Sequence, residues 1–174
     1  MLRPVLVASI VALAPLSAFA TSVHPLTRAD LASRADTIVR AKVGTRATVR
    51  SEKTGRILTR TQLAVLQTYK GEAKRQLELE QMGGTLDGAT LVVPGDAALA
   101  TGEEVVLYLR CTGKERCHLF GLGLGKYGIR AGQDGRKLAV RDLKGLEDAT
   151  GRALMGEPAL PLETLERELK GARP

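Results

Sequence analysis

Cys111 and Cys117 are the two cysteines of the chain and the first residues with an evident chemistry. Five residues separate them, and they stand at the facing ends of two strand-like segments, so a hairpin would bring them together. Redox-active pairs are usually spaced Cys-x-x-Cys at the start of a helix, which is a different spacing and context. The pattern favours a structural disulfide over a redox pair. Such a disulfide forms in an oxidising compartment and stabilises the fold by about 2–3 kcal/mol.

A glycine-rich run contains Gly-x-Gly-x-x-Gly from Gly123 to Gly128, which is the spacing of a dinucleotide-binding loop. In such a site the glycines connect a strand to a helix, whose N-terminus faces the pyrophosphate. Here the following residues alternate like a strand and show no helical period. The run is therefore predicted to be a connection between strands, and no cofactor-binding residue is assigned.

The other chemically versatile side chains do not assemble into a catalytic or metal-binding set. The two histidines, His24 and His118, are fewer than the ligands that a zinc site needs. Glu78 and Glu80 share the outer face of a predicted strand, where paired carboxylates could serve a glycosidase. No aromatic sugar platform lies nearby in the sequence, so a solvated strand face is the preferred interpretation. We expect no catalytic residue, no metal site, no cofactor and no enzymatic activity.

Charge is distributed unevenly along a chain with 26 Lys and Arg residues against 19 Asp and Glu residues. Residues 45–60 hold five basic side chains against one acidic, and residues 107–141 hold eight against two, whereas residues 61–106 are net acidic. If the two basic segments share one side of the fold, that side attracts anions. If they do not, they form ordinary solvated surface. The predicted binding surface consists of Arg50, Lys53, Arg56, Lys114, Arg116 and Lys126.

Residues 1–20 have the pattern of a secretory signal peptide. Arg3 precedes an apolar stretch from Val5 to Leu16, and Ala18-Phe19-Ala20 resembles a cleavage site. The apolar stretch is short for a membrane span, so an uncleaved anchor is the less favoured alternative. We expect a mature chain that begins at Thr21, is secreted or periplasmic, and has no membrane span. Export also argues against nucleic acid as a partner.

Short alternating segments separated by turn residues fill most of the mature chain. Thr27 begins a capping box, which predicts a short helix over 28–34. Leu162, Leu165 and Leu169 recur at helical spacing and predict a C-terminal amphipathic helix after a linker. Strands are predicted at 37–43, 57–69, 76–80, 91–93, 104–111, 117–122, 127–130 and 137–141. Many short strands between two helices favour a small barrel or sandwich.

Several motifs in a fixed order carry a resemblance to known proteins. They are Ala35-Asp36-x-Ile38-Val39-Arg40, Val65-Leu66-x-x-Tyr69-Lys70-Gly71-Glu72, Gly83-Gly84, Val93-Pro94-Gly95, Gly102-Glu103-Glu104-Val105-Val106 and Gly125-Lys126. Over about residues 35–130, the chain resembles a group of uncharacterised secreted bacterial domains that are sometimes attached to matrixin-type metalloproteases. More distantly, it is similar to the netrin-like domain of tissue inhibitors of metalloproteinases. The resemblance implies an OB-like barrel, secretion and a binding role.

One departure limits what this resemblance implies. The inhibitors chelate the protease zinc through the amine and carbonyl of an N-terminal cysteine, whereas the expected mature chain begins Thr21-Ser22. Their inhibitory mechanism is therefore not carried over to this chain.

Together these features predict a mainly β protein. Its small OB-like, netrin-like antiparallel barrel spans 21–146, and a linker and C-terminal helix span 147–174. The predicted function is a secreted, non-enzymatic interaction module that binds another exported or envelope protein. The alternative is a module whose basic surface binds polyanions of the envelope or extracellular space. Salt separates the two, because polyanion binding weakens steeply as ionic strength rises.

Overall fold

The computed structural model describes residues 21–22, 24–112 and 116–171. The predicted signal peptide and Lys114 lie outside these residues. The described helices and strands, in chain order, are β1 (Thr21–Ser22), α1 (Arg28–Arg34), β2 (Thr37–Arg50), β3 (Ile57–Lys70), β4 (Gln76–Met82), β5 (Gly84–Leu86), β6 (Ala89–Leu91), β7 (Glu104–Thr112), β8 (Arg116–Leu119), the 3-10 helix η1 (Leu122–Gly125), β9 (Lys126–Ala131), β10 (Lys137–Val140), β11 (Leu146–Glu147), β12 (Leu160–Pro161) and α2 (Leu162–Gly171).

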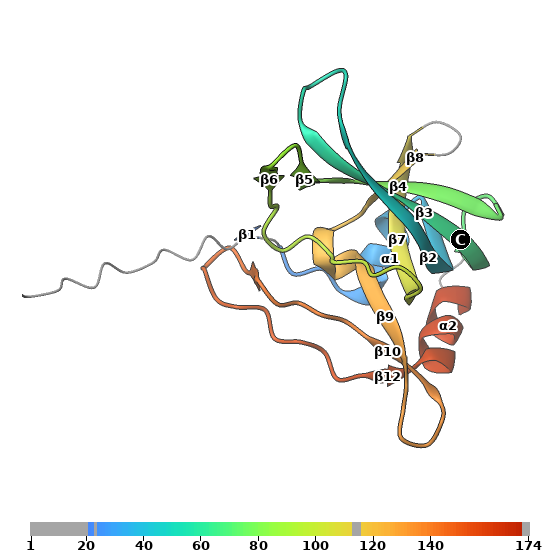
Figure 1. Ribbon diagram of the computed structural model, residues 1–174. Helices are drawn as coiled ribbons and strands as arrows, with labels where there is room; N and C mark the ends of the chain where they lie inside the picture. Colours follow the sequence, from blue (N-terminus) through green and yellow to red (C-terminus); the bar gives the residue numbers. More distant parts are fainter. Residues whose placement is uncertain (1–20, 23, 113–115, 172–174) are drawn as a thin grey trace, which may run out of the picture.

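Eight strands form one mixed sheet in the order β12-β10-β9-β7-β2-β3-β4-β8. The last strand, β8, also pairs with β7, so the pairings through β7, β2, β3, β4 and β8 make a partial ring. Figure 1 shows the long β2–β3 hairpin (teal) projecting from this ring, with α2 (red) near its opposite end. The predicted antiparallel arrangement needs correction at two pairs of strands, namely β1 with β11, which form a separate parallel two-stranded sheet, and β4 with β8. β4 and β8 run parallel, with Glu78 opposite Arg116, because their connection passes through β7.

Local sequence signals account for several of these elements. The Thr27 hydroxyl accepts from the Asp30 backbone, and the Asp30 carboxylate accepts from the Thr27 backbone, which confirms the capping box and the helix at 28–34. The hairpins β7–β8 and β9–β10 are also confirmed. The short strand predicted at 91–93 is wrong, because β6 ends at Leu91 and residues 84–91 form the hairpin β5–β6 around Asp87 and Gly88. Both of these turn residues have positive φ, as a tight hairpin turn requires.

The glycine-rich run forms η1 and then enters β9, so a strand follows it, as predicted. The expected strand at 117–122 is shorter, because β8 ends at Leu119 and the chain turns into η1. Gly125 occupies a position that no other residue fits, since a Cβ there would collide with the carbonyl oxygen of Phe120. These glycines therefore serve close backbone packing.

The core consists of two clusters of buried residues. One fills the partial ring and includes Val39, Leu63, Leu79 and Leu107. The other lies between the helices and the sheet, and contains Leu31 of α1, Tyr108 of β7, and Leu162, Leu165 and Leu169 of α2. The predicted C-terminal helix is present, and its apolar side packs into the same cluster as α1 and the strands. Residues beyond 146 thus contribute directly to the core.

The disulfide between Cys111 and Cys117 is present, as predicted. The two residues lie directly opposite each other in the β7–β8 pair, and Cys117 is fully buried. The cross-link therefore fixes the end of the hairpin against the ring.

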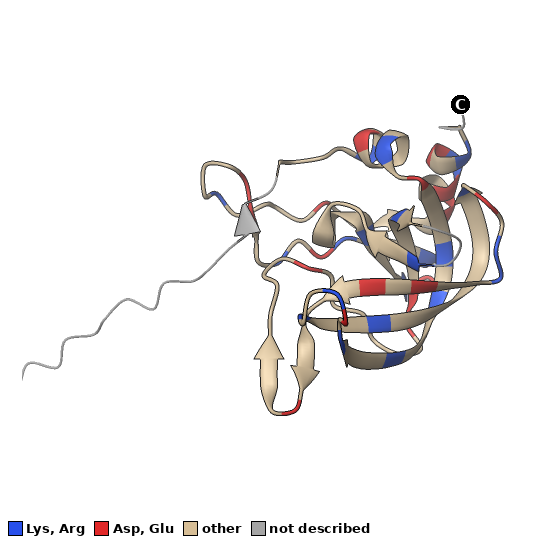
Figure 2. Ribbon diagram, turned by 90° about the horizontal axis from the view of Figure 1, so that it is seen from above, with Lys and Arg blue, Asp and Glu red and all other residues tan. Residues whose placement is uncertain are grey.

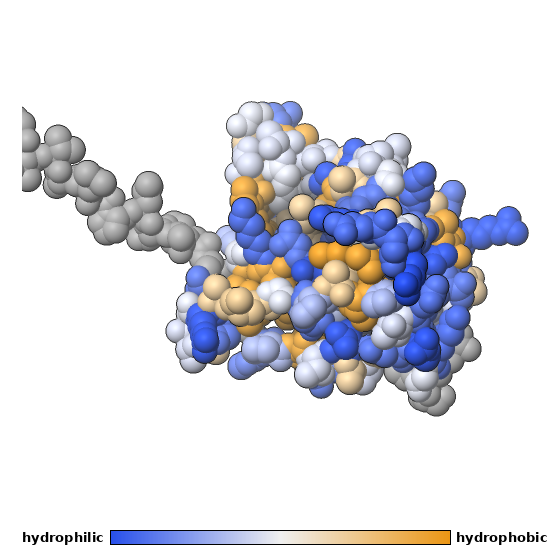
Figure 3. All heavy atoms as spheres, turned by 90° about the horizontal axis from the view of Figure 1, so that it is seen from below, coloured by the Kyte–Doolittle hydropathy of each residue, from blue (hydrophilic) through white to orange (hydrophobic). Residues whose placement is uncertain are grey.

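Apolar patches are visible among hydrophilic residues on the surface (Figure 3). Large exposed hydrophobic residues come from different elements and include Leu66, Met82, Val92 and Met155. Within the described part of the chain, no helix has the length and apolar character needed to cross a membrane.

The three tyrosines of the chain, Tyr69, Tyr108 and Tyr127, are all buried. Burial raises the pKa of Tyr108 to about 12, and it also raises the pKa of Tyr69 and of Tyr127. A group with a raised pKa in the folded state stabilises the fold below its unfolded pKa, which is about 10 for tyrosine. We therefore expect the free energy of unfolding to decrease as pH rises above about 10.

An alkaline titration that follows tyrosinate absorbance and circular dichroism together measures this effect. The chain has no tryptophan, so tyrosine dominates the near-ultraviolet signal. We expect all three tyrosines to ionise together with unfolding, and to titrate near pH 10 when the chain is first unfolded in denaturant. Ionisation of one of them near pH 10 in the folded chain would contradict the prediction.

Candidate functional site

A groove of about 800 Å³ runs over β3 and β4, between the β2–β3 loop and the β7–β8 hairpin. Both of the basic segments seen in the sequence contribute to it, although they are far apart along the chain. We call it the basic groove. It is lined by Val49, Arg50, Ser51, Glu52, Lys53, Thr54, Arg56, Leu58, Arg60, Glu80, Gln81, Met82, Thr112, Arg116 and His118.

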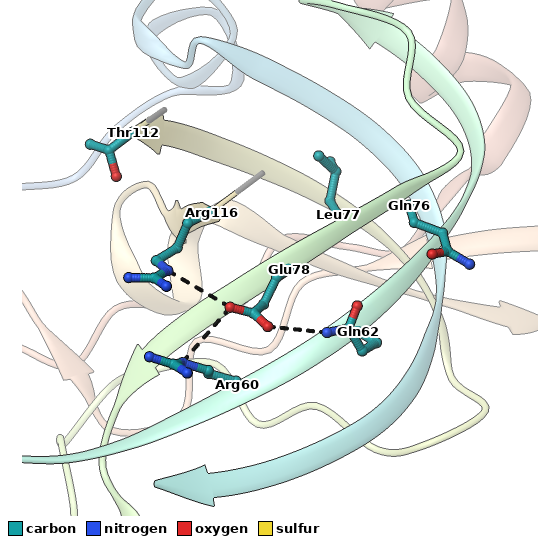
Figure 4. A pocket seen from close by; sticks show the side chains of 7 residues that line it. All are labelled: Arg60, Gln62, Gln76, Leu77, Glu78, Thr112 and Arg116. Carbon is teal, nitrogen blue, oxygen red and sulfur yellow. Dashed lines mark hydrogen bonds and ion pairs between the residues drawn. The ribbon is translucent and has the colours of Figure 1, made fainter. Parts of the chain in front are cut away.

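A second hollow of about 610 Å³ adjoins the basic groove and shares Arg60, Thr112 and Arg116 with it. Figure 4 shows this hollow, in which Arg60 and Arg116 both point toward Glu78. The two hollows therefore form one continuous surface, with these arginines at the junction.

Strand alternation explains why charged side chains face the basic groove. In β3, the residues on either side of Arg60 are buried, so Arg60 points outward. In β4, Leu77 and Leu79 are buried, which turns Glu78 and Glu80 to the outer face. The prediction that the two carboxylates share one strand face is thus confirmed.

The two outward carboxylates bind the two arginines at the junction. Arg60 Nε lies 3.2 Å from Glu80 Oε2 and 3.8 Å from Glu78 Oε1. Arg116 Nε lies 3.7 Å from the same two carboxylates, and the Gln62 amide donates to Glu78 at 3.1 Å. Arg116 is half exposed, so these ion pairs add little stability. Their effect is to hold both guanidinium groups in place at the floor of the surface.

The β2–β3 loop holds the other basic side chains at the rim. Its backbone closes through bonds from Ser51 N to Arg56 O and from Gly55 N to Ser51 O, both 2.8 Å long. Gly55 has φ of 67°, a conformation that favours glycine. Arg50 then donates to the Gly55 carbonyl at 3.1 Å, so the loop is internally braced. Within the described residues, no ion pair involves Lys53 or Arg56. Both residues are exposed, and Arg56 Nη1 lies 3.9 Å from the Met82 sulfur.

The opposite rim is fixed by the disulfide. Thr112 and Arg116 pair directly across β7 and β8, next to the Cys111–Cys117 pair. His118 lies on the same strand, and its Nδ1 is 3.1 Å from the Glu80 carbonyl oxygen. The cross-link therefore positions the side chains that close the groove on this side.

The basic groove has an excess of positive charge. Five of its lining residues are Lys or Arg and two are Glu. Figure 2 shows basic and acidic residues on neighbouring strands of the sheet. None of the described lining residues is Phe, Tyr or Trp, so the groove lacks the stacking platform that single-stranded nucleic acids use. The described residues also contain no cluster of three or more His, Cys, Asp or Glu suited to a metal ion.

The structure brings together four of the six residues predicted to bind, namely Arg50, Lys53, Arg56 and Arg116. Lys126 lies apart from them at the other end of β7. There it forms an ion pair of 2.8 Å with Glu103 and also donates to the Ala98 carbonyl. Lys114 lies outside the described residues. Four of the predicted side chains therefore share one surface, and one serves an internal contact.

Sequence reasoning overlooked Arg60 and the apolar groups Leu58 and Met82. Arg60 was counted in the basic segment but was not included in the predicted binding surface. The feature that identifies Arg60 as part of the groove is the cross-strand register, in which Arg60 lies opposite Glu80. That register is not visible until β3 and β4 are paired.

Comparison with known proteins does not assign the chain to a family. No protein-family model matches the chain, and a search of curated proteins finds no relative.

Proposed function

We propose that this protein is a secreted, non-enzymatic interaction module that binds an acidic segment of another exported protein in the basic groove. The observation that carries this proposal is the meeting of two basic segments, distant in sequence, along one groove. Arg50, Lys53 and Arg56 come from one hairpin, and Arg116 comes from another. Loops held on a rigid sheet are common places for recognition residues.

A protein segment suits the groove better than a uniform polyanion does. Glu52 is exposed among the basic residues, and it would repel a chain that carries negative charge at every unit. Leu58 and Met82 add apolar surface, and Met82 is 43% exposed. A segment that alternates acidic with apolar side chains would satisfy both kinds of contact.

We also propose the finer description of the fold as OB-like. In support, the partial ring contains five strands, which in chain order are β2, β3, β4, β7 and β8, and the third of them, β4, is parallel to the last, β8. OB-folds bind ligands on the face of their second and third strands and with the loops that join strands one to two and four to five. The basic groove lies over β3 and β4, the second and third of these strands in chain order, and it is bordered by the β2–β3 loop and by the paired ends of β7 and β8.

Export remains part of the proposal. The leader-like segment at residues 1–20 and the Cys111–Cys117 disulfide support it, because disulfides persist in oxidising compartments. The similarity of the sequence motifs to those of netrin-like domains is also part of the proposal, and it adds the expectation of a binding role.

The second candidate function is binding of an envelope or extracellular polyanion. The specific observation in its favour is the positive excess of the groove, together with the exposed and unpaired Lys53 and Arg56 among the described residues. Sulfated or phosphorylated polymers would be attracted to such a surface at low ionic strength.

A charge-reversal experiment tests the proposal. The triple variant Arg50→Glu, Lys53→Glu and Arg56→Glu should fold normally, since exposed charges contribute little to stability. It should bind a peptide of alternating Glu and Leu at least about tenfold more weakly than the natural chain, because three attractive charges become repulsive. Fluorescence anisotropy of the labelled peptide, measured at several salt concentrations, gives the affinities.

A matched triple variant, Arg130→Glu, Lys144→Glu and Arg167→Glu, makes the same change in net charge at exposed residues outside the groove. It should retain most of the affinity. If both variants lose affinity equally, the groove is not the site. If dextran sulfate binds tightly with a steep salt dependence and the peptide does not bind, the polyanion function replaces the protein-binding one.

A further inference from the structure

A separate hollow of about 630 Å³ lies between α1 and α2, and it shares no lining residue with the basic groove. Ala29 and Ala32 of α1, Leu169 of α2 and the Tyr108 side chain of β7 provide its apolar wall. This volume is within the range of small-molecule sites, about 300–1,000 Å³. We call it the helix pocket.

Tyr108 supplies an unused hydrogen-bond donor at the helix pocket. The residue is 0% exposed, and its hydroxyl has no hydrogen-bond partner among the described residues. Burial raises the pKa of Tyr108 to about 12, and smaller effects come from nearby charges that include Arg28, Glu168 and Glu157. These three residues line the pocket, as Tyr108 itself does. A buried hydroxyl without a partner is unfavourable, which points to a ligand that accepts a hydrogen bond from it.

Arg141, which binds the lining residue Glu157, also has unused donors. Arg141 is almost completely buried, and its Nη1 binds Glu157 at 2.9 Å, while its Nε and Nη2 have no hydrogen-bond partner. Its guanidinium lies over the Tyr127 ring, 4.5 Å from the ring centroid. Both residues can therefore donate further hydrogen bonds, and the tyrosine hydroxyl can also accept one.

The charges around the helix pocket already balance. Arg28 pairs with Glu157 at 2.9 Å and with Glu168 at 2.8 Å, and Arg141 pairs with Glu157. Two basic and two acidic groups leave no net charge for an ionic ligand to neutralise. A ligand with its own charge would place an unpaired charge beside an apolar wall, which is costly.

We propose that the helix pocket binds a small neutral molecule with an apolar body and one carbonyl oxygen, which accepts a hydrogen bond from Tyr108. The apolar body lies against Ala29, Ala32 and Leu169. This inference is independent of the basic groove and of the partner proposed for it.

Three related probes test the proposal on the full chain purified from a secreting host. Benzylacetone is a neutral ketone with an apolar body, butylbenzene has the same carbon skeleton without oxygen, and hydrocinnamate carries a carboxylate in place of the ketone. Competition saturation-transfer NMR gives their relative affinities. We expect saturable binding of benzylacetone that is tighter than the binding of both other probes.

Two variants locate the contact. Tyr108→Phe removes a hydroxyl that has no partner, so the fold should persist, as circular dichroism can check. This variant should bind benzylacetone about tenfold more weakly than the natural chain does, and its affinity for butylbenzene should be unchanged. Ala29→Leu adds a larger side chain at an exposed position that lines the pocket, so it should weaken the binding of both probes. Ala64→Leu makes the same change at an exposed position on β3 and should not affect the binding of either probe.

Three results would overturn the proposal. One is the absence of saturable benzylacetone binding to the natural chain. Another is an equal affinity of the natural chain and the Tyr108→Phe variant for benzylacetone, since the hydroxyl would then hold water or nothing. The third is tighter binding of hydrocinnamate than of the ketone, which would make the ligand an anion.

Discussion

Replacing Glu157 by Ala is expected to lower the free energy of unfolding by about 3 kcal/mol. Glu157 is the ion-pair partner of Arg141, whose side chain is 1% exposed. Without the carboxylate, the guanidinium stays buried with all of its charge uncompensated, because β10 and the Tyr127 ring hold it in place. Removing one partner of a buried ion pair destabilises the fold by more than the intact pair stabilises it. Chemical denaturation of both chains measures the difference.

Glu168 provides the matched control for this change. Both glutamates pair with Arg28, but Glu168 is 42% exposed and has no contact with the buried arginine among the described ion pairs. Glu168→Ala should therefore cost less than about 1 kcal/mol. The double variant Glu157→Ala with Arg141→Met should recover much of the stability, because no charge remains buried. Equal losses for the two single variants would show that Arg141 does not depend on Glu157.

The contact between Arg141 and Glu157 could not be predicted from the sequence. Arg141 was counted among the basic side chains of a predicted surface, because nothing in the neighbouring residues distinguishes a buried arginine from an exposed one. Glu157 lies in a segment without helical or strand periodicity, which was read as a linker. Their contact depends on how residues 148–160 fold back over the sheet, and this is a tertiary property.

Features with local causes were predicted well. The capping box at Thr27 places α1, turn residues place the β7–β8 and β9–β10 hairpins, and leucine spacing places α2. Each of these depends on residues a few positions apart. The parallel β4–β8 pair and the β5–β6 hairpin were not predicted, because the first needs a long-range register and the second has only three residues in each strand.

For the candidate site, too, local features were predicted from the sequence and long-range contacts were not. Runs of basic residues identified Arg50, Lys53 and Arg56, which lie in one exposed loop, and the disulfide hairpin identified Arg116. A count of charges cannot tell which of them is already used, so Lys126 was included although it pairs with Glu103. Composition thus indicates that a surface is basic, but the pairing of strands decides which residues lie on that surface.

The C-terminal helix provides the other large expected effect. Leu165→Ala should lower the free energy of unfolding by about 3 kcal/mol, since it removes buried methyl groups and leaves a cavity. Leu165 is 0% exposed and belongs to the cluster that joins α1, α2 and the sheet. The neighbouring Glu166 also ties the helix to the sheet, because it accepts hydrogen bonds from Arg40 at 2.7 Å and from Tyr69 at 2.6 Å.

This prediction distinguishes an integral helix from an appended one. If α2 belongs to the same cooperative unit as the strands, Leu165→Ala shifts a single unfolding transition that circular dichroism and tyrosine fluorescence report together. If residues 147–174 form a separate attachment, the main transition stays where it is and only helical signal is lost. Leu66→Ala, at a residue that is 48% exposed on β3, is the matched control and should cost less than about 1 kcal/mol. Leu162, Leu165 and Leu169 share a buried cluster with Leu31 of α1, and α2 contacts β3 and β10, which favours the first outcome.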